Sequence, residues 1–144
     1  MHIVPLGLDH VVLRISDLNR SLVFYRDILG CVVDRRREGL GLYHLRAGAA
    51  QIDLVTLRGE LGKKGGGPPI AEGPNMDHFC LRLETFDGPE LIDYLRGHGL
   101  DPSEIAQRYG AEGDGPSLYV RDPDGNTVEL KGPAYKTNYR KKSR

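Results

Sequence analysis

The chain has 144 residues, enough for one domain or for two half-size modules that share a core. Its 20 basic and 20 acidic residues cancel, so no net field attracts nucleic acid or an anionic membrane surface. No stretch approaches the ~18 apolar residues that span a bilayer, and residues 1–5 lack the long apolar core of a signal peptide. We therefore expect a cytoplasmic protein with no nucleic-acid or membrane partner.

The first half of the chain predicts one strand, one helix and then three strands. Residues 8–15 alternate in polarity, which places His10 and Arg14 on the face opposite the apolar residues. A helical pattern follows from Ser16 to Gly30, with a capping residue at its start and glycine at its end. Three β-like runs then cover residues 31–37, 42–46 and 51–57.

The pattern stops at residue 58 and restarts at residue 76. Residues 58–75 are rich in glycine and proline and have no periodicity, so we interpret them as a linker or loop. Met76-Asp-His-Phe-Cys-Leu-Arg-Leu83 then repeats Leu8-Asp-His-Val-Val-Leu-Arg-Ile15 almost residue for residue.

The second half predicts the same order of elements. A helix is expected over 89–98, followed by β-like runs over 104–108, 117–121 and 126–131. The chain therefore reads as a tandem duplication. We expect one α+β domain of two βαβββ modules, at 7–57 and 76–132, with the linker at 58–75 and a solvated basic tail at 133–144. Cys31 and Cys80 lie inside β-like runs, and we expect both to be buried, reduced thiols.

The duplication places charged residues at corresponding positions of both modules. His10 and His78 occupy the polar face of each first strand, and Asp53 and Glu129 occupy the polar face of each last strand. Carboxylates that lie close together repel unless a cation neutralises them. Imidazole and carboxylate without thiolate suit one divalent ion, either Mn, Fe(II), Co, Ni or Zn. We therefore predict a metal site made of these four residues.

These residues resemble a known family. The stretch 7–13, the stretch Ser21-Leu-Val-Phe-Tyr-Arg-Asp-Ile-Leu-Gly30, the second Asp-His pair and Asp122-Pro-Asp-Gly-Asn-Thr-Val-Glu129 are similar to the vicinal oxygen chelate superfamily, which includes glyoxalases and bleomycin-resistance proteins. The resemblance covers about 7–132. It implies metal ligands at His10, Asp53, His78 and Glu129. Because family members with four ligands more often have glutamate at the position of Asp53, this residue is either a ligand, a water-mediated ligand or an outer residue that orients a histidine.

The resemblance implies a lyase or isomerase that acts on a small substrate chelating the metal through vicinal oxygens. Glu129 and Asp53 are then candidates for the catalytic base. Three alternatives stay open: a fosfomycin-resistance-like thiol transferase, to which residues 112–119 are similar; an extradiol-type dioxygenase; and a non-enzymatic resistance protein that binds a small molecule.

Five further residues are candidates for substrate binding. Arg14 and Arg82 share the faces of the two histidines and can clamp an anion. Ser117, Tyr119 and Arg121 alternate on one face of the strand before the 122–126 turn. We also expect a homodimer, since small paired modules leave apolar edges; the ligands then come from one chain or are exchanged between two.

Overall fold

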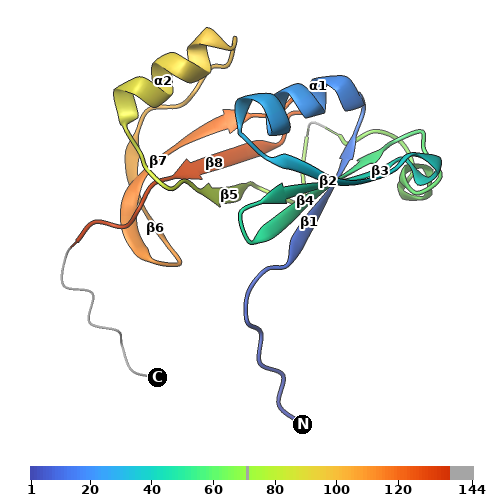
Figure 1. Ribbon diagram of the computed structural model, residues 1–144, viewed down its shortest axis with the longest axis horizontal. Coiled ribbons are helices and arrows are strands. Elements are labelled where there is room, and N and C mark those ends of the chain that lie inside the picture. Colours follow the sequence, from blue (N-terminus) through green and yellow to red (C-terminus); the bar gives the residue numbers. More distant parts are fainter. Residues whose placement is uncertain (71, 137–144) are drawn as a thin grey trace. The chain divides into compact units, whose positions relative to one another are not determined.

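A computed structural model of the chain describes residues 1–70 and 72–136 (Figure 1). It divides into two compact units, Met1–Pro74 and Asn75–Arg144, and each is described here by itself. The part of the predicted basic tail beyond residue 136 lies outside the described residues. Among the residues described, no helix is long and apolar enough to cross a membrane.

The first unit contains a four-stranded sheet and one helical segment. The strands are β1 (His10–Ile15), β2 (Val32–Arg37), β3 (Leu42–Ala47) and β4 (Ala50–Thr56), in the spatial order β1-β4-β3-β2. The predicted helix is continuous but changes type, because α1 (Leu18–Leu22) is an α-helix and η1 (Val23–Ile28) is a π-helix. Asp17 caps it by accepting a hydrogen bond from the backbone N–H of Arg20. Short 3-10 turns, η2 (Glu38–Leu40) and η3 (Gly62–Gly65), complete the unit.

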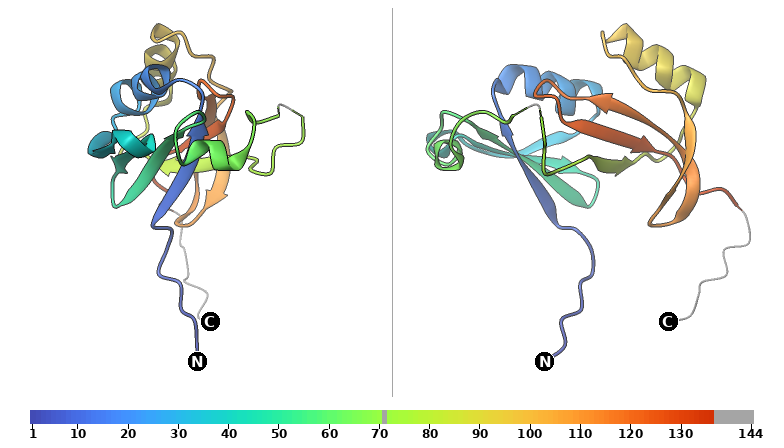
Figure 2. Two further views of the ribbon diagram at one scale, coloured as in Figure 1. Left: turned by 90° about the vertical axis from the view of Figure 1, so that its right-hand side faces the viewer. Right: turned by 180° about the vertical axis from the view of Figure 1, so that it is seen from behind.

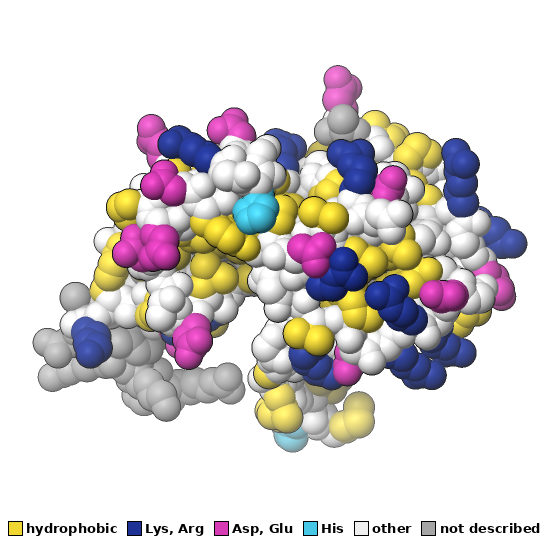
Figure 3. All heavy atoms as spheres, turned by 45° about the horizontal axis from the view of Figure 1, so that its top comes forward, with side chains coloured by type: hydrophobic (Ala, Val, Ile, Leu, Met, Phe, Trp, Pro, Cys, Tyr) yellow, Lys and Arg dark blue, Asp and Glu magenta, His cyan; other side chains and the backbone are white. Residues whose placement is uncertain are grey.

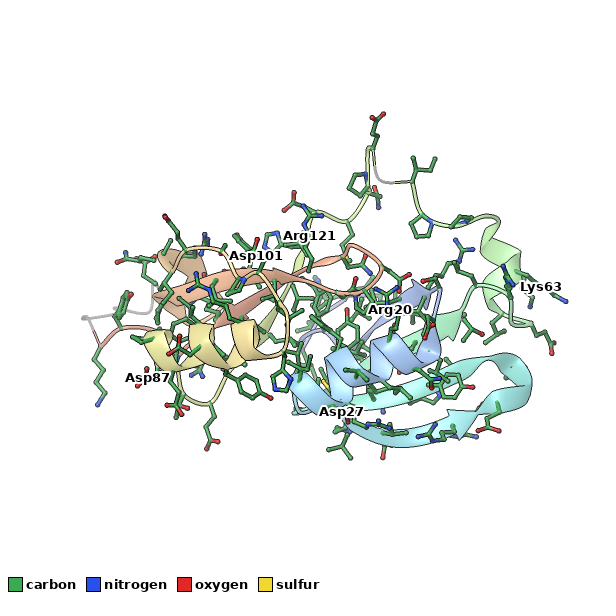
Figure 4. The ribbon with its side chains drawn as sticks, turned by 90° about the horizontal axis from the view of Figure 1, so that it is seen from above. Arg20, Asp27, Lys63, Asp87, Asp101 and Arg121 are labelled. Carbon is green, nitrogen blue, oxygen red and sulfur yellow. The ribbon has the colours of Figure 1, made fainter. Side chains whose placement is uncertain are left out.

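The second unit repeats this order. Its strands are β5 (Phe79–Arg82), β6 (Ala106–Gly110), β7 (Gly113–Arg121) and β8 (Thr127–Lys131), arranged as β5-β8-β7-β6. The helix α2 (Gly88–Gly97) begins at its cap Asp87, whose side chain accepts from the backbone N–H of Glu90. Figure 4 shows Asp87 at the start of this helix and Asp27 in η1 of the other unit.

The two sheets confirm the predicted α+β fold of tandem βαβββ modules. In each sheet the first strand runs parallel to the last, and the remaining pairs are antiparallel. Figure 2 shows both twisted sheets, each with its helix to one side of its own strands. The strand order β1-β4-β3-β2 is matched position by position by β5-β8-β7-β6.

One face of each sheet is apolar and forms the core of its module. In the first sheet the buried side chains on this face include Leu13, Ile15, Leu45, Ile52 and Leu54. In the second they include Leu118, Val120, Val128 and Leu130, and Leu95 of α2 is also fully buried. Burying each such side chain stabilises the fold by about 1.5–3 kcal/mol. Because side chains alternate along a strand, this apolar face forces the intervening residues onto the opposite face.

The turn between β7 and β8 is fixed by Asp122. Its Oδ1 accepts from the backbone N–H groups of Asp124 and Asn126, and its Oδ2 accepts from the Asn126 side chain. Gly125 has a φ of 83°, which only glycine adopts without strain. This turn sets the register that brings Tyr119 opposite Glu129.

Arg14 anchors the start of the glycine-rich segment 58–75. Its Nη2 donates to the carbonyls of Gly62 at 3.1 Å and Gly66 at 2.5 Å. The segment therefore starts as a short turn held against β1.

The cysteine prediction holds for Cys31, which is buried, but it is wrong for Cys80, which is exposed. Both are free thiols. Cys80 is exposed because it lies on the polar side of β5, opposite Glu129, rather than on the apolar face.

Replacing Gly62 by alanine is expected to destabilise the protein by about 3 kcal/mol, because the added Cβ would clash with backbone atoms that cannot rotate away as a side chain can. That Cβ would lie 1.9 Å from the backbone oxygen of Thr56. Gly67→Ala is the matched control, because nothing lies within 4 Å of its Cβ, and it should stay within about 0.5 kcal/mol of the parent. Urea unfolding of both variants measures the difference. Equal stability would contradict the packing of η3 against the end of β4.

Candidate metal centre

Each sheet has a polar face, defined here by the side chains that share a side with His10 in the first sheet and with His78 in the second. On the first polar face, Asp53 lies opposite Val12 of β1 and opposite His44 of β3. On the second, Glu129 lies opposite Cys80 of β5 and opposite Tyr119 of β7. The acid thus pairs, in both modules, with the residue two positions after the histidine. The two modules therefore have the same register between their first and last strands.

The second module brings one imidazole and one carboxylate together. Nε2 of His78 lies 3.3 Å from Oε2 of Glu129, and the Glu129 side chain is buried with 8% exposure. This close approach does not have the direction of a hydrogen bond. The other carboxylate oxygen, Oε1, is buried and has no hydrogen-bond donor in the described parts of the chain.

The repeated Asp-His motif fixes how each imidazole is oriented. Nδ1 of His78 lies 2.6 Å from Oδ2 of Asp77, and Nδ1 of His10 lies 2.6 Å from Oδ1 of Asp9. Since a carboxylate only accepts, each Nδ1 carries the proton and each Nε2 keeps its lone pair. This is the carboxylate–histidine arrangement that orients metal-binding imidazoles.

A row of stacked side chains supports His78 from β7 and β6. The rings of His78 and Tyr119 are 5.3 Å apart in an edge-to-face arrangement, and the guanidinium of Arg108 lies 4.3 Å from the centre of the Tyr119 ring. Nη1 of Arg108 also donates to the hydroxyl and the carbonyl of Ser117, both at 2.9 Å. Tyr119 is thus held between a cation and the imidazole.

The first module pairs Asp53 with a different histidine. Nδ1 of His44 lies 2.9 Å from Oδ1 of Asp53, whose side chain is only 7% exposed. As with Glu129, this contact does not have hydrogen-bond direction, and Oδ1 is a buried oxygen without a donor among the residues described. His10 shares the polar face and feels the charge of Asp53, but its Nδ1 binds Asp9.

The predicted substrate-binding residues make contacts within the chain. Arg14 binds the carbonyls of η3, and Nε of Arg82 lies 2.5 Å from Oε1 of Glu112 in the β6–β7 loop. Arg121, at the end of β7 (Figure 4), donates to the carbonyl of Gly125 at 3.3 Å. Ser117 is buried and accepts from Arg108. Among these five residues, Tyr119 is the one that lies beside a predicted metal ligand.

The orphaned oxygens test whether the residues fit a divalent cation. A buried polar atom without a partner costs about 1–3 kcal/mol, and more when it is charged. Asp53 and Glu129 each carry such an atom. In Asp53 this oxygen, Oδ1, is itself 2.9 Å from Nδ1 of His44, whereas in Glu129 it is Oε1, and the other oxygen, Oε2, lies 3.3 Å from Nε2 of His78. A cation bound by each carboxylate and the neighbouring imidazole nitrogen would neutralise the buried charge, so the donor set fits. Over residues 1–70 and 72–136, no three His, Cys, Asp or Glu side chains gather into a complete site; each module by itself assembles one pair.

Sequence reasoning missed His44, Asp9 and Asp77. The Asp-His repeat itself carried the signal for the two aspartates. For His44 the signal was the short turn after residue 47: the β3–β4 hairpin pairs Ala47 with Ala50, and the same register places His44 opposite Asp53.

Acidic and basic side chains lie near one another on the face drawn in Figure 3, in agreement with the balanced composition.

Comparisons with known proteins agree on the family. The profile of the "Glyoxalase/Bleomycin resistance protein/Dioxygenase superfamily" matches residues 7–130. "Virulence protein STM3117" of Salmonella typhimurium is 29% identical over 124 residues, which cover 85% of this chain and 81% of that protein. Its crystal structure superposes with a TM-score of 0.69 at 26% identity, covering 92% of this chain and all of that one.

Two further relatives carry names of enzymes. "Lactoylglutathione lyase GLX1" of Arabidopsis thaliana is 30% identical over 132 residues, covering 86% of this chain and 44% of that protein. "Metallothiol transferase FosB" of Staphylococcus epidermidis is 26% identical over 129 residues, covering 86% of this chain and 80% of that protein. The chain is thus similar to both glyoxalase-like and fosfomycin-resistance-like proteins.

Replacing Asp9 by alanine is expected to lower the pKa of His10. The hydrogen bond to Asp9 is the largest cause that raises this pKa above 6.5, and the charge of Asp53 adds to it. Without Asp9 the protonated imidazole loses its main partner, so its titration should shift to lower pH. NMR titration of the histidine ring protons in metal-free protein measures the shift. Asp77→Ala is the control and should leave the His10 midpoint in place; a His10 midpoint unchanged in Asp9→Ala would contradict the assigned orientation.

Proposed function

Because the chain belongs to the glyoxalase/bleomycin resistance protein/dioxygenase superfamily, we propose that it is a divalent-metal-dependent enzyme. Its reaction is that of a glyoxalase-type lyase or isomerase on a small substrate with two neighbouring oxygens. The observation that supports this most is the buried carboxylate of Glu129, which has an imidazole nitrogen at 3.3 Å and an oxygen without a donor. Similarity to a lactoylglutathione lyase supports the reaction class.

His10, Asp53, His78 and Glu129 are proposed to hold the ion, which is Mn, Fe(II), Co, Ni or Zn. When bound, such an ion supplies a Lewis acid that polarises a substrate carbonyl. Asp77 keeps the proton of His78 on Nδ1, so Nε2 is available as a donor. The row of Tyr119 and Arg108 holds the imidazole ring in place.

Proton transfer is assigned to the two buried carboxylates. A base must lie within hydrogen-bond reach of the proton that it removes and must have a free lone pair. Glu129 and Asp53 each keep one oxygen that no described donor occupies, so either can accept a proton from a substrate carbon or hydroxyl beside it. The proposed substrate contacts are Arg14, Arg82, Ser117, Tyr119 and Arg121. Because Arg82 is paired with Glu112, it can bind a substrate anion only after this ion pair opens.

A thiol transferase is the second candidate, supported by the similarity to FosB over 86% of the chain. The two candidates differ in the product that holds the thiol. A glyoxalase-type enzyme isomerises the hemithioacetal of a thiol and a 2-oxoaldehyde to a thioester, from which hydroxylamine releases the thiol, whereas the transferase opens an epoxide to give a thioether, which hydroxylamine does not cleave. Thiol titration with each substrate pair, before and after hydroxylamine, separates them. Oxygen uptake with catechols would identify the extradiol-type dioxygenase instead, and a protein that binds ligands but is indifferent to Mn, Ni and Zn would be a non-enzymatic binder.

The homodimer and the cytoplasmic location are also proposals. Ile3, Val4, Leu6 and Leu8 are largely exposed in the first unit, and burying such side chains favours association.

His78→Ala is expected to lower the affinity for Zn or Mn by more than about 100-fold. This is more than the loss expected when a residue that only hydrogen-bonds a metal ligand is removed. Glu129→Gln should behave similarly, because the amide keeps the volume but removes the negative charge. The fold should persist in both variants, since neither side chain belongs to the apolar core. Chelator competition measures the affinity and circular dichroism the fold. The control is Glu112→Gln, which alters an exposed carboxylate of the same module and should bind metal normally.

A further inference from the structure

We propose that His44 is a metal ligand of the first module, binding through Nδ1 together with Asp53. This inference rests on the proposed function and adds a donor on β3, a strand from which the sequence predicted no ligand. It is carried by three observations on the first polar face: a distance, an orientation and a comparison between the modules.

The distance fits two donors of one ion. Donor atoms at about 2.1 Å from an ion are about 3.0 Å apart when they subtend a right angle and about 3.4 Å apart in a tetrahedral site. The distance from His44 Nδ1 to Asp53 Oδ1 is 2.9 Å, and the distance from His78 Nε2 to Glu129 Oε2 is 3.3 Å. Both fall at the spacing of neighbouring ligands.

The orientation excludes an ordinary hydrogen bond. An N–H and a carboxylate that serve only each other point at each other, as those of His10 and Asp9 do at 2.6 Å. His44 and Asp53 are close without this alignment, and Oδ1 of Asp53 stays without a donor although it is buried. A cation bound by both groups would satisfy the oxygen and the nitrogen together.

The comparison between the modules explains why β3 supplies a nitrogen beside the acid in the first module. Glu129 is long enough to reach back along β8 to His78. Asp53 is one methylene shorter, and its nearest imidazole is the one directly opposite on β3. At the corresponding position on β7, the second module has Tyr119, whose ring packs against His78. The module with the short acid thus carries a histidine where the module with the long acid carries a tyrosine.

The decisive test is nitrogen NMR of the full chain labelled with ¹⁵N-histidine and titrated with Zn. We expect the Nδ1 resonance of His44 and the Nε2 resonance of His78 to move to metal-bound positions. A His44 ring that does not respond while His78 does would overturn the assignment of His44 and leave the proposed function standing. If neither ring responds, both proposals fail.

Substitution gives an independent readout. His44→Ala should lower Zn affinity at least about tenfold in chelator competition, whereas an unchanged or higher affinity would show that His44 is no ligand. His44→Asn should retain part of the lost affinity, because its amide oxygen can occupy the place of Nδ1; no difference from alanine would contradict binding through Nδ1. His98→Ala, which removes an exposed histidine packed on Tyr94, controls for nonspecific binding. Urea unfolding of each metal-free variant shows that the fold is retained.

Discussion

A carboxylate oxygen buried without a hydrogen-bond donor is the constraint on which the candidate site depends. Asp53 and Glu129 cannot turn away from the polar face, because their strand neighbours Ile52, Leu54 and Val128 are committed to the core. The hydrophobic pattern of β4 and β8 therefore fixes both charges in place. Leaving them unpaired costs free energy that a cation would recover, so the packing of the core and the chemistry of the site follow from the same alternation.

Strand alternation and the repeated Asp-His motif were enough to predict the duplicated fold and the faces on which His10, His78, Asp53 and Glu129 lie. The face on which a strand residue lies follows from the alternation of polar and apolar residues, and this alternation is visible in the sequence. The π-helical continuation of the first helix was not visible, since Leu22, Tyr25 and Leu29 fit an ordinary helical period as well. Which side chain neighbours Asp53 across the sheet was not visible either, because that requires the hairpin register as well as the face.

Long side chains were the least predictable part of the site. The period of a strand places the Cα atoms of Arg14 and Arg82 on the polar faces, but each guanidinium then extends to a loop, Arg14 to the carbonyls of η3 and Arg82 to Glu112. Arg108 was not singled out, yet it stacks on Tyr119. A flexible side chain of several bonds is placed by whichever acceptor lies within its reach, and loops that carry acceptors have no periodic signature.

The two modules show how a duplicated scaffold can keep a charge pattern while changing its neighbours. A sheet fixes the position of an acid's Cα but not the reach of its side chain. One methylene adds about 1.5 Å, roughly a third of the distance from one strand to the next. Shortening the acid at position 53 therefore favours a partner directly across the ladder over one displaced along it, and His44 occupies that place. The first-strand histidine then keeps its own aspartate, Asp9, as partner. The difference between aspartate and glutamate at one position thus selects which strand supplies the nitrogen beside the acid.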